Sequence, residues 1–92
     1  MPKARTAPPA GPEALIFGAR LQQLRKKRGL TTQTLAQAAD MSPTYVSNLE
    51  VGVKVPSLTT LVRLAAALEC KVTDLVRPFD AHDLQTLTPK RK

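Results

Sequence analysis

The sequence has few of the residues that stabilise small domains by covalent bonds or bulky packing. Its 92 residues include one cysteine, two phenylalanines, one tyrosine and no tryptophan. A single cysteine, Cys70, excludes a disulfide within the chain and suits a reducing compartment such as the cytosol. We interpret Cys70 as a small core residue, with a redox role as the alternative. With so few aromatic residues, the core must consist of Leu, Val and Ala, as in small helical bundles.

Membrane and catalytic signatures are also missing. No apolar run approaches the roughly 20 residues that span a bilayer, and no apolar signal segment follows the N-terminus. The sequence holds no glycine-rich phosphate loop, no cysteine–histidine cluster and no nucleophile with matching histidine and acid partners. His82 is the only histidine and is expected on the surface. We therefore predict a cytoplasmic protein without enzyme activity, metal or cofactor.

The chain carries a strong excess of positive charge. Its net charge is +7 and its pI is about 10.2. Half of the 14 basic residues lie in residues 1–30, where Glu13 is the only acid. Such a chain suits an anionic partner, namely nucleic acid, a membrane surface or an acidic protein.

Composition divides the chain into three segments. Residues 1–12 contain four of the eight prolines and are predicted to be a disordered arm, either inert or reaching DNA through Lys3 and Arg5. Residues 13–77 form the predicted globular domain. Residues 78–92 form an extension with a predicted helical turn, and Asp80 is the expected cap of that turn. Its apolar residues are Phe79, Leu84 and Leu87. They could dock on the domain, pack across a dimer or bind a partner protein through 79–92.

Apolar spacing predicts helices at both ends of the domain. Residues 13–28 place an apolar stripe at i, i+4 and i+7, and Gly29 ends this helix. Residues 58–68 follow a Ser57 cap. Their predicted core face comprises Leu58, Leu61, Leu64, Ala65 and Leu68. A short fifth helix around 72–76, with Thr73 as a second possible start, is stopped by Pro78.

The central segment, residues 30–52, predicts two short helices joined by a tight turn. Thr31 caps the first, 32–39, and the turn at Asp40 needs a residue that tolerates a left-handed backbone. Ser42 caps the second helix, 43–49, and Pro43 occupies its first position, where a missing N–H has no cost.

The second of these helices presents a neutral polar face. Val46 and Leu49 form its buried stripe. The outward residues are Thr44, Tyr45, Ser47 and Asn48. Asn can bridge adenine N6 and N7, and Ser or Thr can bond several base edges, so these side chains suit base recognition in the major groove. The alternative is an ordinary solvated helix face.

The chain resembles the Cro and phage-repressor type of helix-turn-helix proteins, the XRE group, over residues 17–76. The matching landmarks are, in order, GARLQQLRKKRGLT, the LA of Leu35-Ala36, SPTYVSNLE, Gly52, PSLTTLVRLAAALE and the DLV of Asp74–Val76. The resemblance implies an all-α, compact five-helix bundle of the lambda-repressor-like type. Its third helix, 43–49, would enter the major groove of double-stranded DNA, usually as a homodimer on a palindromic operator.

The resemblance also suggests roles for individual residues. Backbone phosphates would be held by Thr32, Gln33, Ser42 and Lys54, although the family often has Gln where Thr32 stands and Gly where Asp40 stands. Arg25 is expected to pair with Glu50 and so tie the first helix to the third. The region that includes Val51, Val53 and Val55 commonly meets the partner subunit in the family; here these valines either do so or fold onto the domain.

We therefore predict a sequence-specific DNA-binding transcriptional regulator, a repressor that acts as a homodimer and is associated with the nucleoid. PTYVSNLE also resembles the recognition helix of restriction–modification controller proteins. The alternatives are an antitoxin or anti-regulator that binds another protein through its C-terminal extension, and a basic nucleic-acid binder without sequence preference. The base-reading helix carries no Lys or Arg, so affinity must come from flanking residues that neutralise phosphates.

Overall fold

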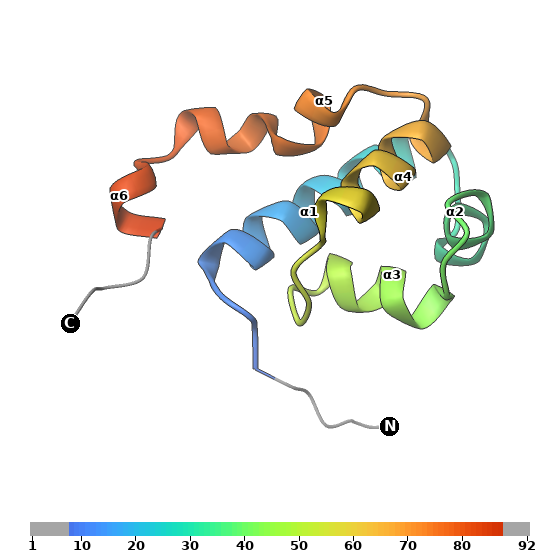
Figure 1. The fold of residues 1–92 in the computed structure, drawn as a ribbon, viewed down its shortest axis with the longest axis horizontal. Coiled ribbons are helices and arrows are strands. Elements are labelled where there is room, and N and C mark those ends of the chain that lie inside the picture. The colour runs from blue at the N-terminus through green and yellow to red at the C-terminus, as the bar shows by residue number, and fades with distance from the viewer. Residues whose placement is uncertain (1–7, 88–92) are drawn as a thin grey trace.

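A computed structural model describes residues 8–87 (Figure 1), and this part of the chain contains helices and no strand. The elements are, in order, α1 (Pro12–Lys27), α2 (Thr32–Ala38), α3 (Pro43–Glu50), α4 (Leu58–Leu68), α5 (Val72–Val76), the 3₁₀ turn η1 (Arg77–Ala81) and α6 (Leu84–Leu87). The predicted all-α class is confirmed, with η1 and the short α6 added to the five expected helices. Lys3 and Arg5 of the predicted arm lie outside the described residues.

Helix α1 is the central element of the bundle. It lies between α3 on one side and the α5–η1 segment on the other, whereas α2 packs on α3 and α4 (Figure 1). The core is mostly aliphatic and comprises Phe17, Leu21, Leu35, Ala36, Ala39, Val46, Leu49, Leu64, Ala65, Leu68 and Leu75. Each fully buried large aliphatic side chain stabilises the fold by about 1.5–3 kcal/mol, so these contacts carry most of the stability.

Local signals in the sequence set the helix ends. Thr31 Oγ1 accepts from the backbone N–H of Thr34 at 3.0 Å, and Ser42 Oγ accepts from that of Tyr45 at 3.1 Å. Gly29 ends α1 at φ 71°, and Asp40 takes the left-handed conformation at φ 58° in the turn between α2 and α3. These caps and turn residues match the sequence prediction because they depend only on near neighbours.

Two segment boundaries differ from the prediction. Helix α1 begins at Pro12, inside the expected arm, and the N–H of Ala10 donates to the carbonyl of Gly52 at 2.8 Å. Residues 10–12 are therefore ordered by the loop that follows α3. In the C-terminal extension Asp83, not Asp80, supplies a cap, since Asp83 Oδ1 accepts from the N–H of Gln85.

Helix α4 corrects the prediction, and α5 begins at the first of its two expected starts. Leu58, expected in the core, has 74% of its surface exposed, whereas Thr60 on the same helix is buried. Helix α5 begins at Val72 because the carboxylate of Asp74 accepts from the backbone N–H of Lys71 at 2.9 Å, which closes the first turn without a capping side chain at Lys71.

None of the helices within residues 8–87 is both long and apolar enough to cross a bilayer.

Candidate nucleic-acid interface

Helix α3 is anchored to the bundle by its apolar side. Val46 and Leu49 are completely buried, while Thr44 and Ser47 are exposed and Asn48 is half-buried. The anchoring is close, because a Cβ added at Gly18 of α1 would collide with the backbone carbonyl oxygens of Leu49 and Glu50. The polar side of α3 is thus held at a fixed distance from α1.

Tyr45 differs from the expected outward orientation. Its side chain is half-buried against the core, and its hydroxyl lies 3.2 Å from Oγ1 of Thr60 on α4. Thr60 Oγ1 also accepts from the hydroxyl of Ser57 at 3.0 Å, so Tyr45 joins a hydrogen-bond chain between α3 and α4. The sequence did not reveal this role of Thr60, because no local pattern relates residues 15 positions apart.

The loop after α3 folds back on the helix that precedes it. The carbonyl of Asn48 accepts from the backbone N–H groups of Val53 and Lys54, at 2.9 and 3.3 Å. Gly52, at φ 85°, packs its backbone against Leu15 of α1. These contacts place the exposed Lys54 close to the C-terminal end of the polar face.

The expected backbone-binding residues lie around the junction of α2 and α3. A shallow hollow there is lined by Gln33, Thr34, Gln37, Met41 and Pro43. Gln33 and Ser42 are exposed and Thr32 is half-buried; the Ser42 oxygen already caps α3. The structure therefore brings Gln33 next to the start of α3, and adds Gln37 as a neighbour that the sequence prediction omitted.

Arg25 and Glu50 form the ion pair that the sequence predicts. Arg25 Nε donates to Glu50 Oε2 at 2.6 Å and Nη2 donates to Oε1 at 3.1 Å, a two-point contact. The side chains are only 11% and 4% exposed, and Arg25 Nη1 also donates to the carbonyl of Leu30 at 2.8 Å. The hydrogen bond to Glu50 raises the pKa of Arg25 further above its ordinary range, so the pair stays charged and joins α1 to the end of α3.

Metal-ligating and reactive groups are sparse in the described part of the chain. Residues 8–87 contain no group of three or more His, Cys, Asp or Glu side chains placed to hold a metal ion, and His82 is exposed. Cys70 is half-buried at the edge of the core, and burial, together with the charge of Asp74, raises the pKa of its thiol. Cys70 is therefore a protonated thiol at neutral pH.

These features define a class of protein. Two short helices enclose a left-handed turn, and the second is fixed by its apolar side while it presents a neutral polar face to solvent; this is a helix-turn-helix domain. The chain belongs to the helix-turn-helix family, whose model matches residues 21–75. The family resemblance drawn from the sequence is confirmed.

Individual relatives agree with this assignment. The chain is 42% identical over 67 residues to the transcriptional regulator DdrOP3 of Deinococcus deserti, covering 73% of this chain and 52% of that one. It is 39% identical over 62 residues to the immunity repressor of Bacillus phage phi105, covering 67% and 43%. The chain thus spans about half the length of these two curated relatives.

Among solved structures, the restriction–modification controller protein C.AhdI of Aeromonas hydrophila is similar, with a TM-score of 0.68 and 35% identity. The similarity covers 68% of this chain and 96% of that one.

Proposed function

We propose that this protein is a sequence-specific DNA-binding transcriptional regulator, a repressor that binds a palindromic operator as a homodimer in the cytoplasm. The observation that carries this proposal is the polar face of α3. That face is uncharged, and the buried Val46 and Leu49 and the Arg25–Glu50 pair hold it rigidly. A rigid helix with hydrogen-bonding side chains is what base recognition in the major groove requires.

The exposed side chains of α3 divide the recognition task. Thr44 and Ser47 would bond base edges, and the amide of Asn48 would bridge an adenine. Tyr45 would contact a base with the exposed part of its ring while its hydroxyl stays beside Thr60. This arrangement supplies sequence preference with little charge.

Phosphate contacts would come from residues at the two ends of the polar face. Gln33 and Thr32 belong to the first turn of α2, Ser42 precedes α3, and the exposed Lys54 follows it. Of these only Lys54 is charged, so one subunit neutralises few phosphates near α3. A second subunit would double these contacts and read the second half of a palindrome.

An exposed aliphatic patch is our candidate for the subunit interface. It consists of Val51 and Val55 from the loop and Leu58 and Val62 from α4, each with more than half of its surface exposed. Leu58 and Val62 are spaced i, i+4 and share one face of α4. Exposed aliphatic side chains are common at interaction sites. The exposed Val51 and Val55 therefore favour contact with a partner subunit, whereas Val53 is half-buried.

The test separates base contacts from phosphate contacts. An operator is first selected from random DNA with the full chain. Asn48→Ala is then expected to weaken operator binding by about 1–3 kcal/mol and to change binding to random DNA little, because the lost contact is specific to a base. Lys54→Ala is expected to weaken binding to operator and to random DNA equally. It should also reduce the slope of log affinity against log salt concentration by about one per subunit.

Two outcomes would contradict these assignments. Equal losses on operator and random DNA would remove Asn48 from the base-reading residues. A selection that yields no preferred sequence would favour the basic nucleic-acid binder without sequence preference.

A narrower candidate is a controller of a restriction–modification system. It is favoured by the similarity to C.AhdI, which this chain covers almost completely. Specific binding to DNA upstream of a neighbouring methyltransferase or endonuclease gene would support it. An antitoxin role would instead require a protein partner; loss of a co-purifying protein on deletion of residues 79–92 would favour that role.

A further inference from the structure

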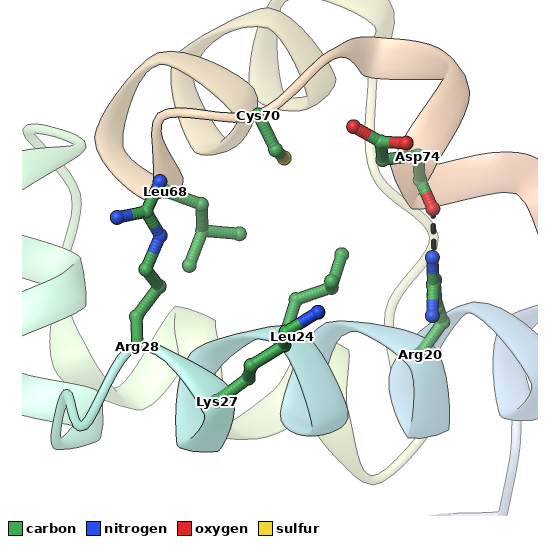
Figure 2. Close-up of a pocket in the computed structure, with 7 residues that line it drawn as sticks. All are labelled: Arg20, Leu24, Lys27, Arg28, Leu68, Cys70 and Asp74. Carbon is green, nitrogen blue, oxygen red and sulfur yellow. Dashed lines mark hydrogen bonds between the residues drawn. The ribbon is translucent and has the colours of Figure 1, made fainter.

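A pocket lies between α1 and the connection from α4 to α5 (Figure 2). Its volume is about 440 Å³, within the usual range for sites that hold small molecules. Arg20 of α1 and Arg28, which follows α1, stand at its two ends. Leu24 and Lys27 lie between them, and Leu68, Cys70 and Asp74 complete the wall. The pocket therefore combines three cations with an apolar floor.

Within residues 8–87, two of the three cations of this pocket, Arg20 and Lys27, form no ion pair with an acid. Arg20 donates through Nε to the backbone carbonyl of Asp74 at 2.8 Å, not to its carboxylate. The carboxylate of Asp74 is instead bound by Arg77, at 2.7 Å, and by the N–H of Lys71. The side chain of Lys27 makes no hydrogen bond or ion pair with any other residue in the range 8–87.

Arg28 contacts Glu69 at the surface. Its Nη1 lies 3.2 Å from Glu69 Oε1, its Nη2 donates to the backbone carbonyl of Glu69 at 2.9 Å, and the two side chains are 44% and 76% exposed. Exposed pairs of this kind contribute little, so a ligand can displace the Glu69 carboxylate at small cost. An anion entering the pocket would meet a free ammonium group and two guanidinium groups.

The pocket is separate from the proposed DNA interface. Gly18, Gln22 and Arg25, at i, i+4 and i+7, face the end of α3. Arg20, Leu24 and Lys27 repeat the same spacing two residues later, and two residues correspond to about 200° around a helix. The two sets therefore lie on nearly opposite faces of α1.

We propose that this pocket binds a small organic anion, one carboxylate or phosphate group on an apolar body. The anionic group would lie between Lys27 and the two arginines, and the apolar body would pack on Leu24, Leu68 and Cys70. Inorganic phosphate would leave the apolar floor uncovered, and a neutral molecule would leave the unpaired Lys27 without a counter-charge. The site is independent of the proposed function, since none of its residues belongs to α2 or α3.

Cys70 provides a direct probe of occupancy, because it lines the pocket and is the only cysteine of the chain. The rate of Cys70 alkylation by an uncharged reagent is measured in the full-length protein at constant ionic strength. Hexanoate is the test anion. Hexanol is a control that has the apolar body without the charge, and inorganic phosphate is a control that has negative charge without an apolar body. Hexanoate is expected to slow alkylation saturably and to raise the melting temperature, whereas hexanol and phosphate do so far less.

Adjacent lysines of α1 supply a matched pair of variants. Lys27 lines the pocket, whereas Lys26 is exposed and does not. Lys27→Gln is expected to weaken hexanoate protection by about tenfold, the usual effect of losing one hydrogen bond to a charged group, and Lys26→Gln to leave it unchanged.

The proposal is overturned by any of three results. These are no protection by hexanoate in the wild-type protein, equal protection by hexanol or phosphate, or equal losses in the two lysine variants. Melting temperatures of both variants without ligand verify that folding is preserved. DNA does not enter the experiment, so its outcome does not depend on the regulator assignment.

Discussion

At the scale of single residues, the position of α3 depends on two contacts with α1. The Arg25–Glu50 pair is almost fully buried, and Gly18 allows the helix backbones to approach until no side chain fits between them. An ion pair buried to this extent would leave an unpaired charge if one partner were removed, a loss that typically costs about 3–5 kcal/mol. The two contacts thus constrain both the separation and the orientation of the base-reading helix.

Gly18→Ala tests the close approach. The new methyl group would collide with the carbonyl oxygens of Leu49 and Glu50, so α3 must shift. We expect a loss of about 1–3 kcal/mol in the free energy of unfolding, measured by urea denaturation, together with weaker operator binding.

Gly29→Ala is the matched control for this change. It introduces the same methyl group into open space, at φ +71°, so backbone strain alone should reduce stability, by about 1–2 kcal/mol. Operator affinity should remain as in the wild-type protein. Unimpaired operator binding by Gly18→Ala would show that the α1–α3 spacing is not critical for recognition.

At the scale of elements, helix ends are held by short-range polar contacts. Thr31, Ser42 and Ser57 cap α2, α3 and α4, and each bond joins residues only three positions apart. Helix α5 is the exception, because its first turn depends on the carboxylate of Asp74 and not on a hydroxyl. The stability of α5 is therefore expected to respond to pH.

Asp74→Asn tests this pH response. The hydrogen bond from the Lys71 backbone, followed by that from Arg77, lowers the pKa of Asp74 from its ordinary value of about 3.9. A lowered folded-state pKa stabilises the fold above the unfolded-state pKa, and this contribution is lost as pH falls through the folded-state pKa. The wild-type protein should therefore melt higher than Asp74→Asn at pH 6, with a difference that shrinks below about pH 4. A difference that is constant from pH 6 to pH 2 would contradict this role.

At the scale of the whole molecule, charge and apolar surface are segregated. The polar face of α3 carries no basic residue, the α1 pocket gathers three, and the aliphatic patch is formed by the α3–α4 loop and α4. In the proposed function, such a domain would read DNA with one region and associate through another. Dimerisation would then compensate for the small number of charged contacts that one subunit offers.

Leu58→Glu combined with Val62→Glu tests the proposed interface. Both side chains are largely exposed, so the changes should leave the monomer folded while placing charges in the subunit contact. Sedimentation equilibrium is expected to show a monomer at concentrations where the wild-type protein is a dimer, and operator affinity should fall with it. Thr59→Glu, an exposed change on the same helix, is the control. A variant dimer as stable as the wild-type one would place the interface elsewhere.

The sequence by itself determined the five main helices, the caps of α2, α3 and α4, and the left-handed residues Gly29, Asp40 and Gly52. It also predicted α3 as the reading helix. These follow from near neighbours and helical periodicity, which the linear order of residues contains. The Arg25–Glu50 pair was also accessible, but only through the family resemblance, because residues 25 positions apart share no local pattern.

Tertiary packing alone decided the rest. It exposed Leu58 and buried Thr60 on the same helix, turned the Tyr45 hydroxyl toward Thr60, and ordered residues 10–12 against the loop after α3. It also brought Arg20, Lys27 and Arg28 around one pocket with Cys70. Periodicity shows which side of a helix is apolar, but how much of that side is covered depends on the crossing of neighbouring helices, which is a property of the folded chain.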